Sequence, residues 1–256
     1  MKKIGIVGGV GWRSTMDYYS EICRRSEQWR LARNLPGVPT PPEITPEMSI
    51  ESLDMNKAVS YLGIDGDEES WARFDSYHRA ALQRLEASGA DFALMASNSP
   101  HHRFASIVRG IEIPVVSIFD AVAMESARIG ARQVLILGTS LTMTSSKFRE
   151  EFAKYGVRAA GPRDEAAKSQ TAGLIAELQL GKVKGAAERL ARIVKISLER
   201  QLKTQPVVCL ACTELPLAFA ERKRLATFEY DGVLYINSTA VHINAAFDFA
   251  VGERSG

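Results

Sequence analysis

Short apolar runs alternate along the chain with longer segments whose apolar residues recur every three or four positions. A bounded apolar run predicts a buried strand, and the longer period predicts an amphipathic helix. Two long helices are expected, with these residues on one face of each: Phe74, Tyr77, Ala81, Leu82 and Leu85 in one, and Val183, Ala187, Leu190, Val194 and Leu198 in the other. Strands that alternate with helices favour parallel sheets covered on both faces, so the fold class is α/β.

The two halves of the chain repeat the same order of elements. Residues 3–9 and 134–139 each form an apolar run that ends in small residues and precedes hydroxyl residues typical of a helix start. In each half a second apolar run follows, ending at Ser97-Asn98-Ser99 or at Cys212-Thr213-Glu214. Equivalent positions therefore carry a hydroxyl, Ser97, and a thiol, Cys212. Further strands are expected at residues 48–53, 113–117, 157–160 and 233–236.

The composition disfavours a nucleic-acid-binding protein and a membrane protein. The 256 residues carry a formal net charge of only +2, with acidic and basic residues interspersed, so no nucleic-acid surface is expected. No apolar run approaches the roughly 20 residues of a membrane span. Three cysteines without a signal sequence or a disulfide framework favour the reducing cytoplasm.

Cys209 and Cys212 form a C-x-x-C pair, but strand residues three apart point to opposite faces, which disfavours a redox or metal pair. No further ligand set completes a zinc site. Cys209 and Cys23 are therefore expected to be small buried apolar residues.

The glycine-rich turn at residues 8–14 matches only part of the dinucleotide-binding pattern, so a nicotinamide or flavin cofactor is not expected. Its main-chain N–H groups at a helix start suit a carboxylate equally well. The proline-rich segment 34–46 excludes a helix or a central strand. It is either a lid over a site or a plain surface connection.

Five short motifs, in order, resemble the aspartate/glutamate racemase superfamily of cofactor-independent enzymes over essentially the whole chain. They are Ile4-Gly5-Ile6-Val7-Gly8-Gly9-Val10-Gly11, Ser97-Asn98-Ser99-Pro100-His101, Gly138-Thr139-x-x-Thr142-Met143, Cys212-Thr213-Glu214-Leu215-Pro216 and Asn237-Ser238-Thr239-Ala240-Val241-His242. The resemblance implies two pseudo-symmetric, doubly wound parallel-sheet domains with the active site in the cleft between them. The first domain would comprise residues 1–113 and 215–256 and the second residues 114–214. A homodimer is expected on the same ground.

Racemisation removes a proton from the carbon beside a carboxylate and returns one from the opposite face, and thiols suit this exchange near neutral pH. The resemblance makes Cys212 the principal acid and base, with Ser97 where the family has its first cysteine. Charge that develops on the substrate carboxylate would be stabilised by backbone donors and small hydroxyls. The candidate residues for this role are Gly11, Asn98, Ser99, Thr139 and Thr213.

Serine is a poor base unless a neighbour takes its proton, and His101, four residues on, is one candidate. A capping or core histidine is the plainer interpretation. The family also contains racemases with threonine at this position and decarboxylases that keep only the second cysteine. A replaced natural cysteine is a further alternative.

Aspartate racemases of the family hold the distal carboxylate with an arginine that residues 49–54 lack. Lys168 resembles the family's second carboxylate ligand, although a solvated helix lysine fits as well, and Arg13 is a further candidate. We therefore expect a cytoplasmic racemase or epimerase that acts on an aspartate-like or glutamate-like amino acid without cofactor or metal. Two alternatives stay open: a decarboxylase of a malonate-like acid, and a catalytically silent protein that binds a small dicarboxylate or amino acid.

Overall fold

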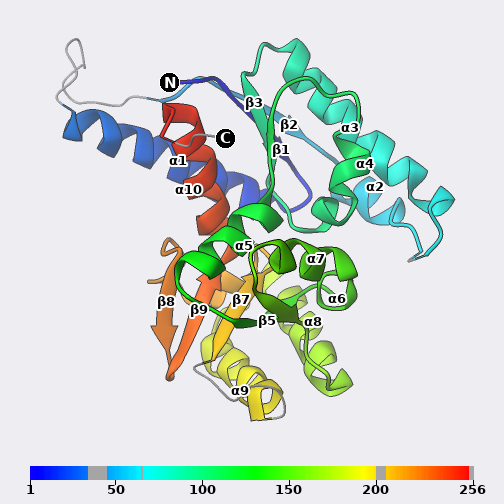
Figure 1. The fold of residues 1–256 in the computed structure, drawn as a ribbon, viewed down its shortest axis with the longest axis vertical. Coiled ribbons are helices and arrows are strands. Elements are labelled where there is room, and N and C mark those ends of the chain that lie inside the picture. Colours follow the sequence, from blue (N-terminus) through cyan, green and yellow to red (C-terminus); the bar gives the residue numbers. More distant parts are fainter. Residues whose placement is uncertain (34–44, 65, 200–205, 254–256) are drawn as a thin grey trace. The chain divides into compact units, whose positions relative to one another are not determined.

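The computed structural model describes residues 1–33, 45–64, 66–199 and 206–253 (Figure 1). The chain forms two compact units, each built around its own sheet. The first unit comprises Met1–Ser117 and Ile243–Gly256, and the second comprises Ile118–His242.

The first unit has a four-stranded parallel sheet in the order β2-β1-β3-β4. Its strands are β1 (Ile4–Gly8), β2 (Met48–Ser52), β3 (Phe92–Met95) and β4 (Val115–Val116). The two central strands, β1 and β3, are buried along their whole length because helices and loops cover both faces. The helical elements are α1 (Trp12–Ala32), α2 (Met55–Ser60), the 3-10 turn η1 (Glu69–Trp71), α3 (Ala72–Ala87), the 3-10 turn η2 (Ser99–Arg103) and α4 (Phe104–Ile107).

The second unit has a five-stranded sheet in the order β6-β5-β7-β9-β8, parallel except for the antiparallel edge pair β8 and β9. Its strands are β5 (Gln133–Gly138), β6 (Arg158–Ala160), β7 (Val207–Ala211), β8 (Thr227–Tyr230) and β9 (Val233–Asn237). Helices α8 and α9 pack with β5 and β7 in one apolar core (Figure 1). The helical elements are α5 (Ile118–Arg128), α6 (Ser140–Thr144), α7 (Ser146–Lys154), α8 (Glu165–Gln179), α9 (Ala186–Glu199) and the 3-10 turn η3 (Leu215–Ala218).

The predicted α/β class with two parallel-rich sheets is confirmed. The apolar face predicted around Phe74, Leu82 and Leu85 is the buried face of α3. The second long helix begins at Ala186, so Val183 lies before it and is 49% exposed, contrary to its predicted place on the buried face. The antiparallel strand β8 was not predicted.

The last helix, α10 (Ser238–Val251), starts in the second unit, and from Ile243 onward its residues belong to the first. From the sequence, the return of the chain to the first unit was predicted at residue 215. The structure places it later because β9, within residues 215–242, pairs in parallel with β7 and so belongs to the second sheet. The proline-rich segment lies outside the described residues, except for Thr45 and Pro46.

None of the helices in the described ranges combines the length and the apolarity that crossing a lipid bilayer requires.

Candidate active site

In the first unit, predicted site residues gather where β1 and β3 end. The two strands are hydrogen-bonded neighbours, with Val7 opposite Met95, so the turn at residues 8–11 and the segment 97–99 leave the same edge of the sheet. Gly11 is the N-cap of the 21-residue helix α1. We call Gly11, Ser97, Asn98 and Ser99 the Ser97 group.

Glycine is required at the second position of this turn. Gly9 has a φ of 87°, and a side chain there would collide with the main chain of Leu53. The Thr15 hydroxyl accepts a hydrogen bond from the Gly9 N–H at 2.9 Å and donates one to the Gly11 carbonyl at 3.2 Å. The turn is therefore fixed by backbone constraint and by a side chain from the first turn of α1.

His101 does not bond to the Ser97 side chain in the way the sequence suggested. Its Nδ1 lies 2.8 Å from the main-chain carbonyl of Ser97, and a carbonyl only accepts, so this nitrogen carries the proton. The ring is 3% exposed and stacks on Phe104. His101 thus orients the Ser97 backbone, and its Nδ1 is not the base that would take the hydroxyl proton.

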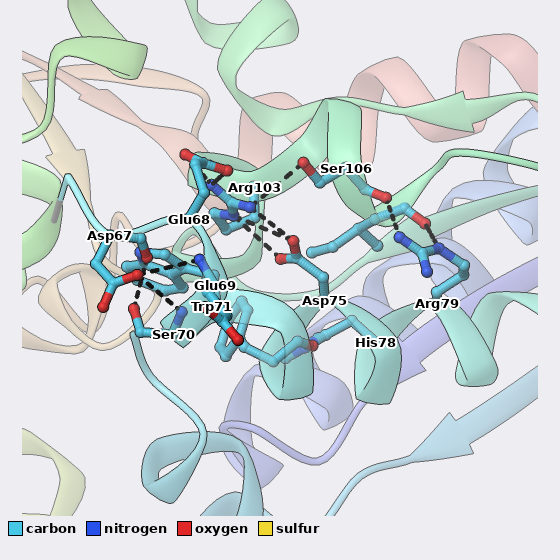
Figure 2. A network of polar contacts seen from close by, with 12 residues as sticks. Asp67, Glu68, Glu69, Ser70, Trp71, Asp75, His78, Arg79, Arg103 and Ser106 are labelled. Atoms are coloured by element: carbon cyan, nitrogen blue, oxygen red, sulfur yellow. Dashed lines mark hydrogen bonds and ion pairs between the residues drawn. The ribbon is translucent and has the colours of Figure 1, made fainter. Parts of the chain in front are cut away.

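Arg103, at the end of η2, attaches the segment that carries Ser97 to α3 and η1. Figure 2 shows the Arg103 guanidinium between Asp75 and Glu68. Its Nη2 donates to the Asp75 carboxylate at 2.8 Å and its Nη1 to the Glu68 carboxylate at 2.9 Å. The ring of Trp71 lies 5.5 Å from the guanidinium carbon. These contacts tie η2 to α3 and η1, so they limit the movement of the loop that holds Ser97–Ser99.

In the second unit, the predicted residues gather where β5 and β7 end. Gly138 lies opposite Ala211 in the sheet, so Thr139 and Cys212 follow neighbouring strand ends. A side chain at Gly138 would meet the Ala211 carbonyl at 2.7 Å, which explains the glycine. Thr139 caps α6, and its hydroxyl lies 3.1 Å from that of Thr142. We call Thr139, Cys212, Thr213 and Glu214 the Cys212 group.

Cys212 is paired with a buried carboxylate. Its thiol donates to Glu214 Oε2 at 3.0 Å, and the Thr213 hydroxyl donates to the same oxygen at 3.0 Å. Cys212 is 6% exposed and Glu214 is 7% exposed. Burial raises the pKa of Cys212 well above its usual value, and the negative charge of Glu214 raises it further. The resting side chain is therefore a thiol whose proton points at a carboxylate acceptor.

Glu214 belongs to one of the five motifs, but no role was predicted for it from the sequence. The available signal was an acidic residue two positions after the cysteine and directly before an apolar Leu-Pro pair, a place where an unpaired carboxylate would be costly.

The ammonium of Lys168 makes no contact with the Cys212 group. Its Nζ donates to Glu165 Oε1 at 2.6 Å, one turn back on α8, and its side chain is 22% exposed. The preceding residue, Ala167, packs in the same apolar core as Cys212. Arg13 lies over the exposed ring of Trp12. A role in substrate binding stays a prediction for both residues.

Of the other two cysteines, Cys209 is buried as predicted, whereas Cys23 is only partly buried. Cys209 is fully buried on β7, burial raises its pKa, and neither it nor Cys23 is in a disulfide. Among the described residues no three His, Cys, Asp or Glu side chains are grouped to hold a metal ion. That the Ser97 group and the Cys212 group act together stays a prediction.

Comparison with known proteins places the chain in a family. The family model described as Asp/Glu/Hydantoin racemase matches residues 7–246. An aspartate racemase homologue from Pyrococcus horikoshii shares 29% identity and a TM-score of 0.73, over 98% of this chain and 100% of that one.

The likeness extends to more distant structures. An aspartate racemase from Picrophilus torridus has 18% identity and a TM-score of 0.69, over 98% of this chain and 95% of that one. A glutamate racemase from Campylobacter jejuni has 15% identity and a TM-score of 0.61, over 99% and 86%. Because the family model covers most of the chain, from the first strand to the last helix, the protein belongs to the Asp/Glu/hydantoin racemase family.

Proposed function

We propose that this protein is a cofactor-independent racemase or epimerase of an aspartate-like or glutamate-like amino acid, with Cys212 as its principal acid and base. The observation that carries the proposal is the hydrogen bond from the Cys212 thiol to the buried Glu214 carboxylate. Membership of a racemase family supports this reaction class.

The thiol and the carboxylate together hold one proton and one negative charge. When the proton moves from sulfur to Glu214, a thiolate forms without adding charge to a buried site, where a second negative charge would be strongly disfavoured. The thiolate then takes the proton of the substrate α-carbon. The C–H bond breaks, an S–H bond forms, and the electron pair passes onto the substrate carboxylate.

The negative charge that develops on the substrate carboxylate requires donors. In the Cys212 group, Thr139 and Thr213 follow neighbouring strand ends; the Thr139 hydroxyl would donate to the substrate, whereas the Thr213 hydroxyl already donates to Glu214 and would have to leave that bond first. In the Ser97 group, Gly11 with Asn98 and Ser99 would supply N–H and polar side-chain donors. Ser97 would deliver or accept the second proton, and its hydroxyl makes it the weaker partner because serine ionises far less readily than cysteine.

The test compares two buried cysteines of the same segment. Cys212→Ala should abolish α-proton exchange into deuterated water, whereas Cys209→Ala should keep it and cost only about 1 kcal/mol of stability. Exchange is followed by proton NMR over a panel of acidic amino acids. Exchange that persists in Cys212→Ala would remove this cysteine from the chemistry.

Glu214→Gln isolates the role of the carboxylate. Since the negative charge of Glu214 raises the pKa of Cys212, its loss should lower that pKa and speed alkylation of the thiol. Turnover should nevertheless fall by about 10²-fold or more, because the acceptor for the thiol proton is gone. Faster alkylation together with unchanged turnover would show that Glu214 takes no part in proton transfer.

A second candidate function is favoured by the resting state of Cys212. A protonated thiol is the form that a decarboxylase of a malonate-like acid needs, since one acid is enough to protonate the enolate after carbon dioxide leaves. Gas release from a malonate without α-proton exchange on amino acids would identify that reaction. Neither reaction, with ligand-induced stabilisation retained, would identify a binding protein.

A further inference from the structure

A pocket of about 390 Å³ lies at the β6 edge of the second sheet, and three arginines line it: Arg149, Arg158 and Arg163. They come from α7, from β6 and from the connection that follows β6. All three are exposed. The apolar part of the lining includes Val134, Ala153 and Val157. We call this the arginine pocket.

Acidic side chains do not balance the three charges. Within the described part of the chain, none of the three arginines makes an ion pair. The carboxylates closest to them in sequence are committed elsewhere. Glu150 accepts from Ser146 and Lys147, and Glu151 accepts from Lys154.

Asp164 and Glu165 complete this set, because the Asp164 carboxylate caps α8 by accepting the N–H groups of Ala166 and Ala167, and Glu165 accepts from Lys168. Three positive charges therefore share one concave surface without a matching carboxylate, which favours an anion as the missing partner.

The sheet edge adds a main-chain donor. The Arg158 N–H bonds to the Arg132 carbonyl of the neighbouring strand segment at 3.0 Å. Successive residues of a strand direct their N–H groups to opposite sides, so the Ala159 N–H points to the open edge of β6. Ala159 also lines the arginine pocket.

The arginine pocket is separate from the Cys212 group of the same unit. It involves Gln133, Val134 and Leu135 at the start of β5, whereas Thr139 follows the other end of that strand. Four strand residues from Leu135 to Thr139 span roughly 13 Å. A ligand in the arginine pocket would therefore leave the Cys212 group unoccupied.

We propose that the arginine pocket binds a small molecule through a phosphoryl group with at least two negative charges. A carboxylate presents two oxygens in one plane and is satisfied by a single guanidinium, whereas a phosphoryl group offers three oxygens in three directions. Three arginines from three different segments suit the second geometry. The apolar lining leaves room for the organic part of a phosphate ester or anhydride.

Calorimetric titration of the full chain with inorganic pyrophosphate tests this proposal. Wild type should bind, and Arg158→Ala should bind at least about tenfold more weakly because charge-assisted hydrogen bonds are lost. Arg163→Ala serves as a second variant. Arg192→Ala is the matched control, since it removes an exposed arginine of the same unit that lies outside the pocket, and its affinity should match wild type.

Further ligands identify what is recognised. ADP that binds as tightly as pyrophosphate or more tightly, and is weakened in the same way by Arg158→Ala, supports a phosphate-bearing organic ligand. Malonate at the same concentration should not displace pyrophosphate. Displacement by malonate, equal weakening by Arg192→Ala, no binding by wild type, or much tighter binding of an RNA oligonucleotide would each overturn the proposal.

Discussion

Arg103 allows a controlled test of what burial does to an ion pair, because one guanidinium contacts two carboxylates in different surroundings. The Asp75 side chain is 9% exposed, whereas that of Glu68 is 81% exposed. The two substitutions Asp75→Asn and Glu68→Gln each remove one negative charge with little change in size. Their effects on the free energy of unfolding should differ sharply.

The magnitudes follow from the surroundings of each carboxylate. Removing one partner of a buried pair typically costs about 3–5 kcal/mol, because the other charge is left without compensation. Arg103 would keep Glu68 and Ser106, so we expect the lower end of that range, about 3 kcal/mol, for Asp75→Asn. An exposed pair contributes little, so Glu68→Gln should cost less than about 0.5 kcal/mol.

Tryptophan fluorescence during urea unfolding provides the assay. All three tryptophans, Trp12, Trp29 and Trp71, lie in the first unit, so the signal reports the unit that contains Arg103. The transition midpoint should fall clearly for Asp75→Asn and remain almost unchanged for Glu68→Gln. Equal shifts for the two variants would refute the argument from burial.

Three further predictions concern other residues. Burial lowers the pKa of His102 to about 4, so the stability of the fold should be full above the unfolded pKa near 6.5 and should fall by about 3 kcal/mol as the pH drops from there to about 4. Urea unfolding at several pH values should show a flatter dependence of stability on pH for His102→Leu. An unchanged slope would exclude His102 as the source of that dependence. Lys168→Ala should change the free energy of unfolding by less than about 0.5 kcal/mol, yet it should reduce the rise in melting temperature that a dicarboxylate causes. An undiminished rise would show that Lys168 is only a surface charge. If Ser97 is the weaker of two proton-transfer groups, one enantiomer should exchange its α-proton roughly 10²-fold more slowly than the other, a deficit of about 3 kcal/mol; Ser97→Cys should accelerate that enantiomer selectively, and a gain shared equally by both would contradict the assignment.

Local patterns were enough to predict the main elements. Continuous apolar runs predicted β1, β3, β5 and β7, because strands buried on both faces need no polar alternation. The strand β8 was missed although its signal is present. Asp231 and Gly232, both with positive φ, form a two-residue turn typical of a hairpin with β9.

Only part of the site could be predicted from the sequence. Thr139 and Cys212 follow predicted strands, so parallel pairing implied that they share a sheet edge. The bond between Arg103 and Asp75 joins residues 28 positions apart on different elements, and no periodicity records such a contact. The direction of the His101 ring is likewise set by packing against Phe104.

The path of α10 has a consequence for synthesis on the ribosome. The first unit needs residues of α10, because Phe249 packs against Phe92 and the Ala250 carbonyl accepts the N–H of Lys2. The second unit, Ile118–His242, is therefore translated before the first unit has all of its residues. An N-terminal domain usually folds before the rest of a chain is made, but the first unit of this protein cannot complete its core in that order. The sheet formed by the earliest residues stays incompletely covered until α10 has been synthesised.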